Sequence, residues 1–119
     1  MQSLGAKPVT LLEWYEGVTE QTGLYPEANT GSLVAVNYCM LGLGEAGECQ
    51  GKLKKVWRGD VTLDQQREAL LDELGDTLWY VVRGAKELGL SFEDLIRRNG
   101  DKVLDRKARN VTRGSGDNR

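Results

Sequence analysis

Helix-start signals constrain the fold of this sequence more than any other feature. The segments TLLE (10–13) and TLDQ (62–65) each have the form of a capping box, in which two side chains satisfy backbone N–H groups of a helix's first turn. Behind each box, apolar residues recur three and four positions apart, as on one face of a helix. In no segment do apolar and polar residues alternate as they do in a half-buried strand. The sequence therefore predicts an all-α fold class.

Four helices are expected from these signals and from the residues that interrupt them. Ser32 and Ser91 can cap two further apolar runs, and Gly89 stands where a helix C-terminal cap is usual. Glycine, proline and asparagine crowd into residues 23–31 and predict a loop there. The expected helices span approximately residues 10–21, 32–57, 62–88 and 91–109. The tail 110–119 has no periodicity and is expected to dangle or to dock as a loop.

Composition excludes several classes of protein. The chain has 119 residues, which predicts a single domain, and it contains no histidine, which removes Ser-His and Cys-His catalysis and histidine-bound zinc. Cys39 and Cys49 match neither a disulfide framework nor a zinc spacing, so buried free thiols are expected. A net charge of −2 argues against binding a nucleic-acid polymer. The sequence shows neither a long apolar run nor a signal peptide, so we expect a cytoplasmic protein without a membrane partner.

The segment GLGEAGE (42–48) reads literally as the G-x-G-x-x-G pattern of dinucleotide-binding loops. That pattern must follow a strand and open a helix, whereas the apolar residues upstream have helical spacing. Glu45 would also lie beside the phosphates with no charge to offset it. We therefore interpret the segment as part of a helix that carries acids.

The expected helix 32–57 has a face on which apolar residues give way to acidic ones. At about 100° per residue, Val34, Tyr38, Leu41, Glu45, Glu48, Lys52 and Lys55 share this face. Carboxylates that continue an apolar stripe point inward, where a cation is their usual partner. Three glycines in this helix cost about 1 kcal/mol each relative to alanine, so a close neighbour or ligand is expected beside them.

A second acidic pair repeats the same spacing. Glu73 and Asp76 lie three residues apart on the expected helix 62–88, and Tyr80 lies between them one turn further on. If this helix runs antiparallel beside the first, four carboxylates meet at one point, and hard oxygen ligands of this kind suit Mg²⁺ or Mn²⁺. The alternative is that both pairs are ordinary solvated helix faces, which is common among acidic helices.

The arrangement Glu45-x-x-Glu48, 24 intervening residues and Glu73-x-x-Asp76 resembles the E-x-x-E…E-x-x-D signature of the MazG-like all-α nucleoside triphosphate pyrophosphohydrolases. The segments LGLGEAGECQGKLKK and LLDELGDTLWYV resemble the two acidic helices of that family, and RGSGDNR resembles the end of its short members. The resemblance covers about residues 33 to 119. One departure is Gly44, where many members carry an additional glutamate. The absence of this glutamate argues against a second metal ion more than against the first.

The resemblance implies a four-helix bundle that hydrolyses nucleoside triphosphates to the monophosphate and pyrophosphate. It implies Mg²⁺ bound by Glu45, Glu48, Glu73 and Asp76, with Glu45 or Glu48 as the catalytic base. Substrate contacts are expected from the following residues: Tyr80 for the base or sugar, and Asn99, Lys102, Arg106, Lys52 and Lys55 for phosphate. Ser115, Asp117 and Arg119 in the tail could form a lid. A homodimer or homotetramer is also expected, with apolar surface around Trp14, Trp57 and Trp79.

Two alternatives stay open at this point. One is phosphoribosyl-ATP pyrophosphohydrolase, a neighbour in the same superfamily. The other is a non-catalytic helical module that binds a nucleotide or a protein partner and uses its acids to hold a structural ion.

Overall fold

The computed structural model describes residues 8–109, which form five α-helices and no strand. In chain order they are α1 (Leu11–Thr22), α2 (Leu33–Gly44), α3 (Gly47–Trp57), α4 (Leu63–Glu87) and α5 (Phe92–Ala108). The all-α fold class predicted from the sequence is confirmed, and all four predicted helical stretches are helical apart from one interruption.

Side-chain caps set the helix starts. Thr10 and Thr62 form the two predicted capping boxes with Glu13 and Gln65, respectively. The hydroxyls of Ser32 and Ser91 accept hydrogen bonds from the third residue of α2 and of α5. The predicted starts are therefore confirmed, because a cap depends only on residues within one helical turn.

The prediction of one continuous helix over residues 32–57 is wrong. Between α2 and α3, Glu45 and Ala46 form a turn in which successive N–H groups donate to the carbonyl three residues back instead of four. Glycine stands on either side of this turn, at Gly44 and Gly47, and glycine is the residue at which helices most readily kink after proline. The tighter turn redirects the chain at the position of the first acidic pair.

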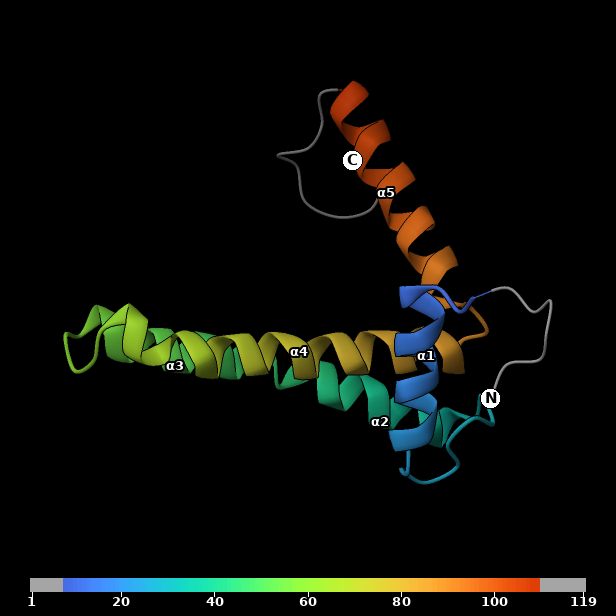
Figure 1. Ribbon diagram of the computed structural model, residues 1–119, viewed down its shortest axis with the longest axis horizontal. Coiled ribbons are helices and arrows are strands. Elements are labelled where there is room, and N and C mark those ends of the chain that lie inside the picture. The colour runs from blue at the N-terminus through green and yellow to red at the C-terminus, as the bar shows by residue number, and fades with distance from the viewer. Residues whose placement is uncertain (1–7, 110–119) are drawn as a thin grey trace.

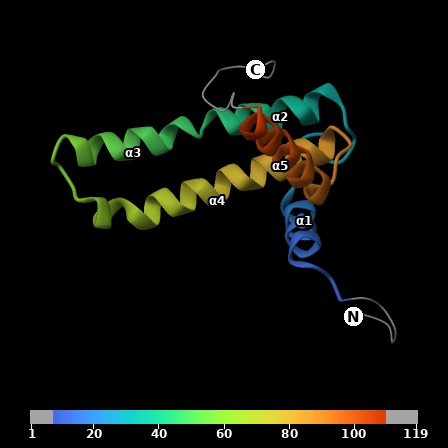
Figure 2. The same ribbon diagram turned by 90° about the horizontal axis from the view of Figure 1, so that it is seen from above.

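The helices α2 and α3 run one after the other along α4 and form a long antiparallel hairpin with it (Figures 1 and 2). α1 packs across the C-terminal half of α4 and against the start of α5. α5 then extends away from the hairpin, as Figure 1 shows. The Cα radius of gyration is 17.8 Å, compared with about 13 Å for a compact domain of 100 residues. A single chain is thus extended rather than globular.

Two glycines allow α2 and α4 to approach each other. A Cβ on Gly42 would lie 2.2 Å from the ring of Tyr80, and a Cβ on Gly84 would lie 3.1 Å from the terminal methyl of Met40. Cys39, which is fully buried, lies beside Gly84 at the same crossing. Part of the glycine content of the predicted helix is therefore explained by helix packing.

A buried polar network ties the loop between α1 and α2 to the end of α4. Glu87 accepts hydrogen bonds from the Tyr25 hydroxyl and from the backbone N–H groups of Asn29 (2.8 Å) and Gly31 (2.9 Å). Arg83 donates to Glu87, Tyr25 and Asn29, and the side chains of Arg83 and Glu87 have no exposed surface. The loop runs through residues with positive φ at positions 27, 29 and 31, so these bonds fix an otherwise unfavourable path.

Of the helices described, none is long and apolar enough to cross a membrane. Cys39 and Cys49 are free thiols, as predicted; Cys39 is buried as expected, whereas Cys49 is only half-buried.

Candidate functional site

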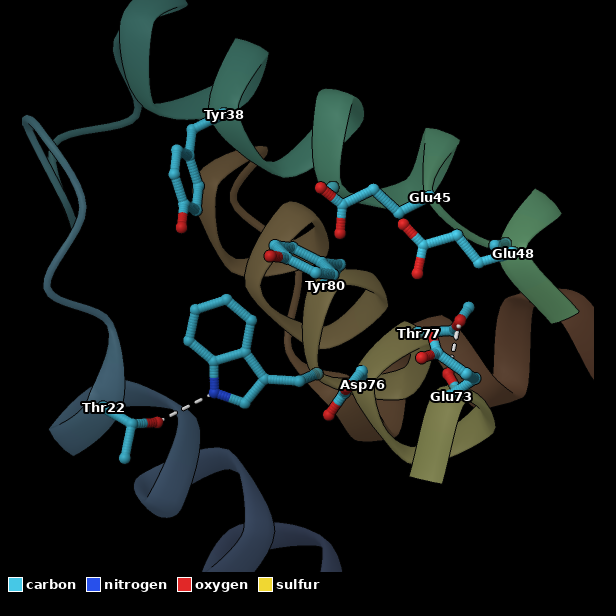
Figure 3. Close-up of a pocket in the computed structure, with 11 residues that line it drawn as sticks. Thr22, Tyr38, Glu45, Glu48, Glu73, Asp76, Thr77 and Tyr80 are labelled. Atoms are coloured by element: carbon cyan, nitrogen blue, oxygen red, sulfur yellow. Dashed lines mark hydrogen bonds between the residues drawn. The ribbon is translucent and has the colours of Figure 1, made fainter. Parts of the chain in front are cut away.

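The two acidic pairs line one solvent-open cavity of about 440 Å³ between the α2–α3 junction and α4 (Figure 3). Glu45 and Glu48 come from the turn between α2 and α3 and from the first turn of α3, and Glu73 and Asp76 come from the middle of α4. In Figure 3 the carboxylates of Glu45 and Glu48 extend from their helix toward α4. Both members of the first pair therefore lie on the side of the α2–α3 junction that faces the second pair.

Within residues 8–109, no three carboxylates lie close enough together to form a ready-made metal cage. Four negative side chains around one cavity repel each other, and this repulsion favours spread rotamers when no cation is present. The donor set itself suits Mg²⁺ or Mn²⁺, because every candidate ligand is a carboxylate oxygen and the cavity is open to water. The chain therefore provides carboxylate ligands suited to such an ion, but they lie farther apart than the ligands of a bound ion would.

Lys52, one of the predicted phosphate-binding residues, lies beside the acids. Its ammonium forms an ion pair of 3.9 Å with Glu73, and both side chains are partly buried. The backbone carbonyl of Lys52 also accepts a hydrogen bond from Gln66, which joins α3 to α4. Lys55, the other predicted lysine on α3, is exposed and does not line the cavity.

Tyr80 lines the cavity as expected, but its ring lies directly over Gly42 on the neighbouring helix. Burial and, to a smaller extent, the nearby Tyr38 hydroxyl and the carboxylates of Glu45 and Asp76 raise the pKa of Tyr80. Its hydroxyl therefore stays protonated at neutral pH and can donate a hydrogen bond.

The predicted residues of α5 do not reach this cavity within one chain. Asn99 lines a separate, mostly apolar cavity where α4 and α5 cross. Lys102 is exposed and Arg106 is buried, and neither lines the acidic cavity. Ser115, Asp117 and Arg119 lie outside the described residues.

Six residues that line the cavity were not predicted as site residues: Thr22, Tyr38, Gly42, Ala46, Thr77 and Trp79. The spacing of Tyr38 carried a usable signal, because it lies seven residues before Glu45 and therefore on the same helix face. Thr22 belongs to α1 and reaches the cavity only through the packing of α1 on α4, which the sequence does not reveal.

Comparisons with known proteins agree with this geometry. The model of the MazG nucleotide pyrophosphohydrolase domain matches residues 38–111, a range that contains both acidic pairs. The Gene 37 protein of Mycobacterium phage L5 is 39% identical over 109 residues, which cover 88% of this chain and 96% of that protein. Its name states no activity. No solved structure matches significantly.

Proposed function

Because the chain belongs to the MazG nucleotide pyrophosphohydrolase family, we propose that it hydrolyses nucleoside or deoxynucleoside triphosphates to the monophosphate and pyrophosphate. The observation that carries the proposal is the shared cavity of Glu45, Glu48, Glu73 and Asp76. If the acids only solvated two helix faces, they would not need to line the same cavity from two antiparallel helices. They support a site for a divalent cation and the phosphates that accompany it.

Glu45, Glu48, Glu73 and Asp76 would hold Mg²⁺, or Mn²⁺ in its place. When bound, the ion neutralises phosphate charge and lowers the pKa of a coordinated water. Glu48 or Glu45 accepts the proton of the attacking water, since both lie on the same side of the cavity. Lys52, which pairs with Glu73, limits the net negative charge that an incoming triphosphate meets.

The remaining phosphate contacts are proposed for Asn99, Lys102, Arg106 and Lys55. An arginine can grip two phosphate oxygens with its planar guanidinium, and a lysine acts as a mobile point charge. Because the three α5 residues lie away from the cavity in one chain, their role requires a change in the position of α5 or a second copy of the chain.

A phosphoribosyl-ATP substrate and a non-catalytic binding module are the alternatives. The short glycine-rich acidic segment at residues 42–48 favours the nucleoside triphosphate reaction over the first. The openness of the acidic cavity to solvent favours an enzyme over the second, because a structural ion is normally enclosed by its ligands.

We expect the purified protein to release pyrophosphate, and not orthophosphate, from one or more NTPs or dNTPs in the presence of Mg²⁺. Turnover of phosphoribosyl-ATP alone would favour that alternative. Removing the metal with EDTA is expected to lower the rate by about 100-fold or more, because metal stabilisation of transition-state charge is worth several kcal/mol. Added Mn²⁺ should restore activity. Release of orthophosphate alone would indicate a different reaction, and absence of turnover on every substrate would favour the binding module.

We also expect copies of this chain to associate as a homodimer or homotetramer. On α4, Leu71, Leu74 and Leu78 form an apolar stripe with exposed fractions of 54%, 59% and 40%, and such stripes on a soluble protein usually mark an interface. Sedimentation equilibrium should give at least twice the mass of one chain. A Leu74→Glu variant should sediment at a lower mass, and a wild-type monomer at tens of micromolar would contradict the expectation.

A further inference from the structure

The cavity has two chemically different ends. At the aromatic end, the rings of Tyr38 and Trp79 lie 6.1 Å and 5.1 Å from the ring of Tyr80. Glu45 and Asp76 lie next to Tyr80, and Glu48 and Glu73 lie farther from Tyr38 (Figure 3). Tyr38 lies in α2 and Glu45 directly follows the end of this helix, so a separation of seven residues places them about 10 Å apart along the helix direction. If the carboxylates hold a divalent cation, a ligand that spans the cavity combines a planar apolar part with an anionic part about one nucleoside away.

Tyr38 has the properties of a fixed stacking platform. Its ring lies parallel to that of Tyr25, with 4.7 Å between centroids and 13° between planes. Tyr25 is itself buried and held by Glu87 and Arg83, so the supported ring cannot turn freely. Tyr38 still exposes 39% of its surface and lines the cavity, which leaves ring surface for a ligand.

The polar atoms of Trp79 and Thr22, at this end of the cavity, are already used within the protein. The indole N–H of Trp79 donates to the Thr22 hydroxyl at 2.8 Å, and that hydroxyl donates to the carbonyl of Val18 at 2.8 Å. Trp79 thus presents ring surface rather than a free donor. Among the described residues that line the cavity there is no amide, lysine or arginine side chain to read the edge of a base.

We propose that the aromatic end is a nucleobase subsite in which Tyr38 is the stacking platform and base choice follows stacking area rather than edge hydrogen bonds. The inference rests on the proposed function, because the acidic end must then take the phosphates. Every base has a π-face, so stacking tolerates different bases. Purines, with the larger face, are bound modestly more tightly than pyrimidines, within about 10-fold. Tyr80, packed over Gly42, closes the subsite from the side of α4.

The test is a steady-state comparison of Tyr38→Leu, Tyr38→Trp and wild-type protein on ATP and CTP. Loss of one stacking partner is expected to raise KM about 5- to 100-fold in Tyr38→Leu, with a change in kcat of less than about 3-fold. Tyr38→Trp should restore KM. The inhibition constant of inorganic tripolyphosphate, which has no base, should be the same in all three proteins. Leu33→Ala, at an exposed position on α2 outside the cavity, serves as the control variant.

Three results would overturn the inference: an unchanged KM in a folded Tyr38→Leu variant, an equal loss for tripolyphosphate, or a preference for one base above about 100-fold. Circular dichroism checks folding. If the wild-type protein turns over no nucleotide, calorimetric measurement of AMP binding tests the nucleobase subsite separately from hydrolysis. If AMP binds, and Tyr38→Leu weakens binding while Tyr38→Trp restores it, the subsite proposal stands and the hydrolysis proposal fails. If AMP does not bind, both proposals fail.

Discussion

Replacing Glu48 by glutamine is expected to reduce pyrophosphate release by about 100- to 10,000-fold, the range typical for loss of a general base. Glutamine keeps the size of the side chain but cannot accept a proton. Glu48 is exposed in the first turn of α3, so the substitution should leave the helical content and the unfolding midpoint unchanged. The measurement is the initial rate of pyrophosphate release at saturating Mg²⁺ and substrate.

The matched control is Asp72→Asn. Asp72 is an exposed acid of α4 next to Glu73, and it does not line the cavity. Asp72→Asn removes one negative charge from α4, the helix that packs against α3, so a general electrostatic effect would appear in both variants. Activity in Glu48→Gln within about 3-fold of the control would contradict the proposed role.

Metal ligation and proton transfer can be separated by the dependence of rate on metal concentration. Asp76→Asn should shift the Mg²⁺ concentration needed for half-maximal rate upward, because one anionic ligand is lost from α4. High Mg²⁺ should therefore recover much of its activity. The same treatment should not rescue Glu48→Gln if Glu48 acts as the base.

Helix boundaries were predictable because their causes are local. Thr10 and Thr62 cap helices through residues three positions away, and Gly89, with φ of 88°, ends α4 as its position in the sequence indicated. The interruption at Glu45 and Ala46 was not predicted. A glycine lowers helix stability at any position, and the sequence does not reveal which of several glycines marks a break and which, like Gly42, makes room for a neighbouring ring.

The acidic side of the site was predictable for a similar reason. An i, i+3 spacing puts each pair on one helix face, and only the antiparallel pairing of two helices had to be assumed. The aromatic end was not predictable, since Thr22 and Trp79 meet across 57 positions of sequence. The positions of Asn99, Lys102 and Arg106 depend on the direction of α5, which is set by the contacts of its first turn with α1, including a hydrogen bond from the Phe92 N–H to Glu16.

Glu87→Gln is expected to lower the free energy of unfolding by about 3 to 5 kcal/mol, the usual cost of leaving one partner of a buried ion pair alone. Arg83 would keep its charge with no exposed surface, and its Nη1 already lacks a hydrogen-bond partner among the described residues. Urea unfolding followed by circular dichroism measures the loss. In contrast, the double variant Arg83→Met/Glu87→Leu should be less destabilised than the sum of its two single variants, because it removes both charges together.

The pH dependence of unfolding tests whether the charge of Glu87 is the cause. Burial alone would raise the pKa of this carboxyl, but the hydrogen bonds from Tyr25, Asn29 and Gly31 and the charge of Arg83 together lower it. Burial and the bond to Glu87 raise the pKa of Tyr25, so the phenol remains a donor at neutral pH. A lowered pKa means that the stabilisation is present above the pKa of an unfolded glutamate, about 4.3, and is lost as the pH falls through the lower pKa of the folded state. The stability difference between wild type and Glu87→Gln should therefore be constant from pH 6 to 8 and shrink below about pH 4. A difference that stays constant down to pH 3 would mean that Glu87 acts through its shape and not through its charge.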